Sequence, residues 1–173
     1  MHITETELLI RLVAATVFSA FIGLERQFHG KPAGLRTHAL AGLGAAIMTI
    51  CGVIVADQTE GVEGMATDPT RIASIVIQGI GFIGAGVIIQ SKGFVKGLTS
   101  ATTLWFVAAI GIATGFGLWM VSITATCLAL ILLVLFRQFE EEAEKSELLH
   151  FIREGNILTR ASESAKKRMV KKK

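Results

Sequence analysis

The chain has 173 residues, of which 51% are hydrophobic and only 18% are charged, with 18 glycines, two prolines and no tyrosine. Soluble globular domains carry about 25% charged residues, and the apolar residues of this chain lie in long runs instead of at helical or strand spacing. This composition excludes disordered, collagen-like and disulfide-rich secreted chains. The net charge of +3 is small, but it is placed very unevenly along the chain.

Five apolar stretches are long enough to cross a membrane as helices. A bilayer core of about 30 Å requires roughly 17–25 residues per helix at about 1.5 Å rise per residue. Acidic Glu5 and Glu7 precede the first stretch, which argues against a cleaved signal peptide. We therefore predict an all-α membrane protein, a bundle of five transmembrane helices at residues 8–24, 38–56, 72–89, 99–116 and 118–136. The last two should form a tight antiparallel hairpin, because almost nothing separates them.

The placement of lysine and arginine sets the expected orientation, because cytoplasmic loops carry an excess of these residues. Three basic residues follow the first stretch, two follow the third, and ten lie in residues 137–173. The opposite side has only Arg71. We therefore expect the N-terminus outside and the C-terminus in the cytoplasm.

Residues 137–173 form a charged cytoplasmic tail after the membrane domain of residues 1–136 in this prediction. The beginning of the tail mixes glutamates with scattered apolar residues, which favours an amphipathic helix. Its end is polybasic, and it is either a solvated terminus or a contact with anionic membrane lipid, worth about 1 kcal/mol per basic residue near the surface. The basic residues concerned are Lys166, Lys167, Arg168, Lys171, Lys172 and Lys173.

A glycine-rich segment, residues 79–84, has the G-x-G-x-x-G spacing of a dinucleotide-binding loop. It lies inside an apolar run, and no acidic residue follows about 20 positions later as that fingerprint requires. Small residues instead let helix backbones approach closely in lipid, which offers no hydrophobic drive between helices. We interpret six glycines as helix-packing residues, namely Gly79, Gly81, Gly84, Gly86, Gly111 and Gly115.

Polar groups inside the spans are functional candidates, because a charge there costs roughly 2.5–3.5 kcal/mol on insertion scales. Arg11 lies about one turn into the first stretch, where it either reaches the outer headgroups or turns inward to pair with an acidic group. Gln78 lies in the middle of the third stretch, where interhelical hydrogen bonding is the simplest interpretation.

The densest polar segment, residues 25–38, joins the first two stretches on the expected cytoplasmic side. Glu25 can pair with Arg26 or Arg36 as an ion-pair latch, which is the interpretation that we favour. It can also offer a carboxylate to a hard cation such as Mg²⁺, which takes oxygen ligands. The basic residues of the segment can alternatively hold an anionic headgroup or a phosphate. We take as the candidate functional polar cluster Glu25, Arg26, Arg36, His38, Arg71 and Gln78, and leave metal ligands unassigned.

Several short sequences carry a family signature, in this order along the chain: Gly23-Leu24-Glu25-Arg26-Gln27, Gly34-Leu35-Arg36-Thr37-His38, Leu43-Gly44-Ala45, Asp68-Pro69-Thr70-Arg71-Ile72-Ala73, Gly79-Ile80-Gly81-Phe82-Ile83-Gly84-Ala85-Gly86, and Gly97-Leu98-Thr99-Ser100-Ala101 with Leu104-Trp105. Together they resemble the MgtC/SapB family over about residues 10–136. The resemblance implies a bacterial inner-membrane protein linked to magnesium limitation and, in pathogens, to survival inside host cells. It also implies a regulator of membrane energetics and ion homeostasis instead of a pump.

The chain departs from the family pattern in two respects. Thr114 stands where the resemblance makes cysteine common, so a role for that thiol is not expected here. Longer members also append a folded soluble domain, whereas about 37 residues follow the fifth stretch here. We therefore expect a short form without the soluble C-terminal regulatory domain.

Two functions remain open at this stage. The first is a regulator or partner of other membrane proteins in adaptation to low Mg²⁺. The second is a small oligomeric transporter or channel for Mg²⁺ or another ion. No Walker A, serine-elbow or H-E-x-x-H sequence is present, so we expect no enzymatic activity and no cofactor. The expected partners are membrane lipid and another membrane protein or a second copy, with Mg²⁺ as a candidate ligand and no nucleic acid.

Overall fold

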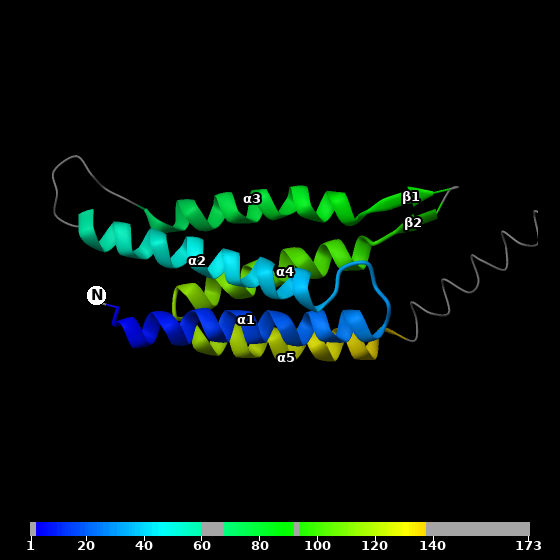
Figure 1. Ribbon diagram of the computed structural model, residues 1–173, viewed down its shortest axis with the longest axis horizontal. Helices are drawn as coiled ribbons and strands as arrows, with labels where there is room; N and C mark the ends of the chain where they lie inside the picture. The colour runs from blue at the N-terminus through cyan, green and yellow to red at the C-terminus, as the bar shows by residue number, and fades with distance from the viewer. Residues whose placement is uncertain (1–2, 60–67, 92–93, 138–173) are drawn as a thin grey trace, which may run out of the picture. The chain divides into compact units, whose positions relative to one another are not determined.

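The computed structural model describes residues 3–59, 68–91 and 94–137 (Figure 1). The chain divides into two compact units, Met1–Ile131 and Leu132–Lys173, and the packing described below is that of the first unit. In chain order the elements are α1 (Glu5–Phe28), α2 (Leu35–Thr59), α3 (Pro69–Val87), β1 (Ile89–Ser91), β2 (Phe94–Lys96), α4 (Leu98–Gly115) and α5 (Trp119–Leu135).

All five predicted helices are present, but their bounds differ from the apolar stretches. α1 and α2 each extend about one turn beyond the predicted residues at both ends, because hydrogen bonding of the helix continues through polar residues that a hydropathy criterion excludes. α3 begins at Pro69 instead of residue 72 and ends at Val87 instead of residue 89, where β1 takes over. α4 and α5 lie within one residue of their predicted bounds.

The helix ends follow local capping chemistry. The Asp68 carboxylate caps α3, accepting hydrogen bonds from the Thr70 N–H at 2.8 Å and the Thr70 hydroxyl at 2.7 Å, and Pro69 occupies the first helical turn. These hydrogen bonds hold the pKa of Asp68 below its usual value. Gly117 adopts a left-handed φ of 79° in the short turn between α4 and α5, so that α5 runs back in the opposite direction to α4 (Figure 1).

Small residues set the packing of the bundle. The closest pairs of helices are α1 with α2 and α2 with α4. A Cβ atom on Gly111 would lie 2.2 Å from the Gly42 carbonyl oxygen, and one on Gly42 would overlap the Ser19 side chain. Because those distances are shorter than van der Waals contact, only glycine allows the helix backbones to come this close.

The core lies where α2, α3 and α4 meet. Ala45, Ile80 and Ala108 form a buried apolar cluster there. α4 is the most deeply buried of the four longer helices, and α3 is the most open. α5 contributes three buried residues, among them Ser122, whose hydroxyl lies 3.0 Å from that of Thr114.

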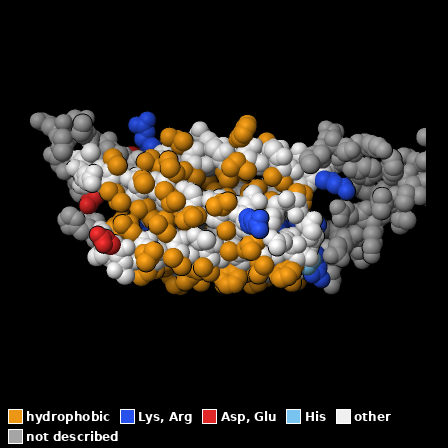
Figure 2. All heavy atoms as spheres, viewed as in Figure 1, with side chains coloured by type: hydrophobic (Ala, Val, Ile, Leu, Met, Phe, Trp, Pro, Cys, Tyr) orange, Lys and Arg blue, Asp and Glu red, His pale blue; other side chains and the backbone are white. Residues whose placement is uncertain are grey.

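The outside of the helices is apolar. Large hydrophobic side chains are exposed on every helix, for example Leu9, Leu40, Phe82, Trp105 and Leu132. Hydrophobic side chains are spread along the face shown in Figure 2. Soluble monomers rarely expose apolar patches larger than a few hundred Å², so lipid is the solvent that suits this surface. α1, α2, α3 and α4 are each long and apolar enough to span a membrane, whereas α5 is an apolar helix of 17 residues.

One element was not predicted. β1 and β2 form a two-stranded antiparallel hairpin after α3, with Ile89 opposite Lys96 and Ser91 opposite Phe94. No strand was predicted between the third and fourth apolar stretches, and each of the two strands has only three residues. The predicted amphipathic helix and polybasic end of the tail lie in residues 138–173, outside the described residues.

Candidate functional site

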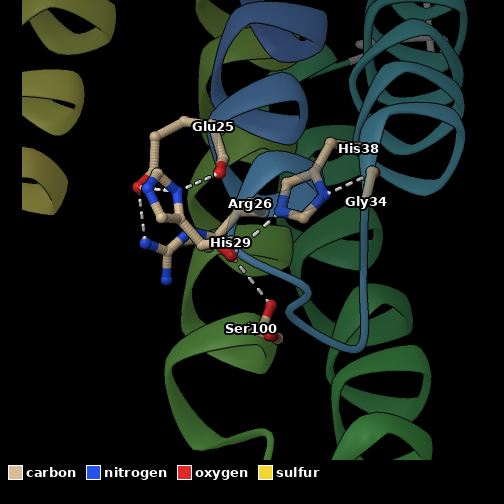
Figure 3. A network of polar contacts seen from close by, with 7 residues as sticks. Glu25, Arg26, His29, Gly34, His38 and Ser100 are labelled. Carbon is tan, nitrogen blue, oxygen red and sulfur yellow. Dashed lines mark hydrogen bonds and ion pairs between the residues drawn. The ribbon is translucent and has the colours of Figure 1, made fainter. Parts of the chain in front are cut away.

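The last turn of α1 carries a buried ion pair. Only 1% of the Arg26 surface is exposed, and its guanidinium donates two hydrogen bonds to the Glu25 carboxylate, from Nε to Oε2 at 2.5 Å and from Nη2 to Oε1 at 3.0 Å. His29 Nδ1 lies 3.1 Å from Glu25 Oε1 (Figure 3). A two-pronged arginine–carboxylate contact is among the stronger ion-pair geometries, and it makes Arg26 the partner of Glu25.

His38 links α2 to α4 beside this pair (Figure 3). It is fully buried; its Nδ1 lies 2.9 Å from the Gly34 carbonyl oxygen, and its Nε2 lies 2.9 Å from the Thr103 hydroxyl. Because a carbonyl oxygen only accepts hydrogen bonds, Nδ1 is the donor in the first contact. The Thr103 hydroxyl also lies 3.0 Å from the Ser100 carbonyl oxygen, so its single hydrogen can reach either Ser100 or a neutral His38.

The polar network therefore combines residues that are distant in sequence. α1 supplies Glu25 and Arg26, and its C-cap residue is His29. α2 supplies His38, and α4 supplies Thr103 with the Ser100 carbonyl. Thr103 was not among the sequence candidates, since nothing in a Thr-rich apolar segment distinguishes the hydroxyl that meets a histidine. In the part of the chain that the structure describes, no three His, Cys, Asp or Glu side chains come together to hold a metal ion.

Three of the six predicted polar residues lie apart from this network. Arg36 is exposed at the start of α2, and Arg71 is exposed at the start of α3. Gln78 is exposed at the centre of α3, and among the described residues it has no hydrogen bond. The structure therefore brings together Glu25, Arg26 and His38 but does not bring the other three to the same place.

The six predicted packing glycines also divide into two groups. Gly84 packs against Ala101, and Gly111 and Gly115 pack against α2. A Cβ atom added to any of the other three would meet no atom within 4 Å among the described residues, and these are Gly79, Gly81 and Gly86. All three lie on α3, which has the least buried surface of the longer helices.

A second buried arginine lies near the other end of α1. Arg11 is almost fully buried; its Nη1 donates to the Gly115 carbonyl oxygen at 2.8 Å, and its Nη2 pairs with the Glu7 carboxylate. A Cβ atom on Gly117 would lie 2.7 Å from the Arg11 guanidinium. Of the two possibilities that the sequence left open, Arg11 follows the inward one, and its charge stabilises the C-terminal end of α4.

These features define the class of protein. An apolar exterior, long apolar helices and charges that are buried and paired inside the bundle are the properties of an α-helical membrane protein. Comparison with known sequences then gives the family. Residues 12–142 match the MgtC family, and the chain belongs to it.

The relatives of the chain are bacterial proteins of greater length. The chain is 40% identical over 132 residues to the "Putative magnesium transporter YhiD" of Escherichia coli, covering 76% of this chain and 61% of that protein. It is 37% identical over 147 residues to Protein MgtC of Salmonella typhimurium, covering 85% of this chain and 58% of that protein. An uncharacterized protein of Haemophilus influenzae is 40% identical over 123 residues, covering 70% and 52%. The chain thus spans about half to three fifths of these relatives, and no solved structure matches it.

Proposed function

We propose that this chain is a non-enzymatic protein of the bacterial inner membrane that serves magnesium homeostasis as a regulator or partner of other membrane proteins. Family membership and the magnesium in the printed name of the Escherichia coli relative support the connection with magnesium. The pairing of Glu25 supports the regulatory role over an ion pathway through this site.

The Glu25 carboxylate carries this argument. Mg²⁺ is bound through oxygen ligands, typically one or two carboxylates with several waters. Both carboxylate oxygens of Glu25 already accept hydrogen bonds from Arg26, and His29 lies against one of them. A buried guanidinium beside the carboxylate repels a divalent cation. The Glu25 carboxylate therefore acts as an ion-pair latch with the neighbouring side chains and not as a cation ligand.

We further propose five spans, with the N-terminus outside and the C-terminus in the cytoplasm. At about 1.5 Å per residue, the 17 residues of α5 reach about 25 Å, which with modest thinning of the bilayer is enough to cross. The basic residues that flank the helices favour this orientation. An even number of spans would place both termini in the same compartment, so tags at the two ends distinguish the alternatives.

A second candidate is a small oligomeric transporter for Mg²⁺ or another ion. It is favoured by the printed name of the Escherichia coli relative, which is 40% identical to this chain. Flux through purified protein separates the two proposals.

The experiment uses the full chain reconstituted in liposomes that contain a Mg²⁺-sensitive dye. We expect the dye response to an external Mg²⁺ step to equal that of empty liposomes, with the chain and with the Glu25→Gln variant. The matched control is Arg36→Gln, which changes an exposed charge outside the polar network. Mg²⁺ entry that requires the chain would overturn the regulatory proposal and favour transport. If Glu25→Gln alters that entry more than Arg36→Gln does, Glu25 belongs to the ion pathway.

A further inference from the structure

α3 has one face in the bundle and one open face. Ile80 and Gly84 are buried against the other helices. A Cβ atom added to Gly84 would lie 3.6 Å from the Ala101 Cβ atom. α3 has two buried residues, whereas α4 has ten. The open face is therefore available to lipid or to another protein.

The open face has the spacing of a helix-pairing seam. Ile75, Gln78, Phe82 and Ala85 follow one another at alternating steps of three and four residues, and all four are exposed. That alternation is the a/d pattern through which two helices pack along each other. Ile75 and Phe82 are 63% and 86% exposed, so their apolar side chains are open to a partner. Gly79, beside the seam, leaves room for a second backbone.

The polar side chain of Gln78 indicates that the open face contacts a protein partner instead of lipid. Its carboxamide lies at the centre of α3 and has no hydrogen bond among the described residues. Hydrocarbon offers no hydrogen-bond partner, and an unpaired amide there is costly. Polar residues at such positions commonly bond across a helix–helix interface.

We infer that this face of α3 binds a second copy of the same chain, with the Gln78 carboxamides of the two copies hydrogen-bonded to each other. Copies inserted with the same topology run parallel, and a two-fold axis along the membrane normal places each residue at the depth of its counterpart. A carboxamide has both donors and an acceptor, so it is complementary to itself. A charged residue at this position would instead repel its copy.

The end of the seam is consistent with this arrangement. Arg71 lies seven residues before Gln78 and therefore continues the same face, but it lies in the first turn of α3 beside the exposed Asp68. The outer end of the seam thus carries both charge signs, in a region where water and headgroups screen repulsion. This inference holds for a regulator and for a transporter alike.

Disulfide trapping of the full chain in liposomes tests the inference. In a background with Cys51→Ser and Cys127→Ser, Ile75→Cys places a thiol on the seam and leaves Gln78 intact. The matched control is Leu128→Cys on α5, which is also exposed, at 53%. Under mild oxidation we expect a dimer band with Ile75→Cys and not with Leu128→Cys.

Two further variants test the hydrogen bond and the close approach. Adding Gln78→Leu to Ile75→Cys should reduce the crosslinked fraction about three- to tenfold, given the usual strength of interhelical hydrogen bonds in membranes. Gly79→Leu should reduce it by blocking the second backbone. Circular dichroism verifies that each variant keeps its helices.

Three results would overturn the inference. The first is equal crosslinking of Ile75→Cys and Leu128→Cys, which indicates random collision. The second is crosslinking that neither Gln78→Leu nor Gly79→Leu reduces. The third is crosslinking in native membranes of Ile75→Cys to a different protein without a dimer of this chain, which assigns the face to another partner.

Discussion

Replacement of Gly111 by alanine tests the closest helix contact in the bundle. A methyl group at this position would lie 2.2 Å from the Gly42 carbonyl oxygen and 3.0 Å from the Ala45 Cβ atom. Carbon and oxygen atoms normally approach to about 3.3 Å. Because a backbone oxygen cannot rotate away, α2 and α4 have to separate by about 1 Å to admit the methyl group.

The expected cost follows from two opposing terms. Overpacking of a tight interior costs about 1–3 kcal/mol. Alanine favours a helix over glycine by about 1 kcal/mol. Since the clash of Gly111→Ala is with backbone, we place its cost toward the upper part of that range and expect a net loss of about 1–2 kcal/mol in the free energy of unfolding.

Equilibrium unfolding of the full chain in detergent micelles, titrated with sodium dodecyl sulfate and followed by circular dichroism, measures this loss. The matched control is Gly44→Ala on α2, where an added Cβ atom meets nothing within 4 Å. The control should leave stability unchanged or raise it by up to about 1 kcal/mol. If Gly111→Ala is as stable as Gly44→Ala, the close approach of α2 and α4 is refuted.

Three further predictions concern the polar contacts. Arg11→Leu should lower the free energy of unfolding by about 1–3 kcal/mol, because the buried carbonyl at the end of α4 loses its donor; stability equal to that of the unchanged chain would contradict this contact. Thr103→Val should lower the free energy of unfolding by a similar amount, about 1–3 kcal/mol, since the ring of buried His38 loses its hydrogen-bond partner. The exposed control Thr102→Val should lower it less. Equal losses would argue against the hydrogen bond between His38 and Thr103. Because hydrogen bonds lower the pKa of Asp68, its carboxylate stabilises the start of α3 at neutral pH, and this contribution is lost as the pH falls below about 4. After correction for the intrinsic rate, hydrogen exchange of the first α3 amides should therefore be faster at acidic than at neutral pH. The acceleration should be smaller in Asp68→Asn, which keeps a capping oxygen that does not titrate. Identical pH profiles of the two proteins would refute the role of the Asp68 carboxylate as the cap of α3.

The sequence by itself determined the helices and the family. Each apolar run is a local property whose length matches a bilayer, and the short connection around Gly117 required a reversal of direction between α4 and α5. The motifs from Gly23 to Trp105 indicated the MgtC family, to which the chain belongs. The acidic and basic neighbours Glu25 and Arg26 already suggested their ion pair.

Only the tertiary structure decided which side of each helix faces the bundle. It joined Arg11 to Gly115 across 104 positions and His38 to Thr103 across 65 positions, and it buried Arg26 but left Arg36 exposed. In a soluble protein, the hydrophobic face of a helix reveals which side is buried. Lipid and protein interior are both apolar, so the apolar residues of these helices do not by themselves show which side of each helix faces the bundle. For the same reason the spacing of the α3 glycines could not show that Gly79 would lie on an open face.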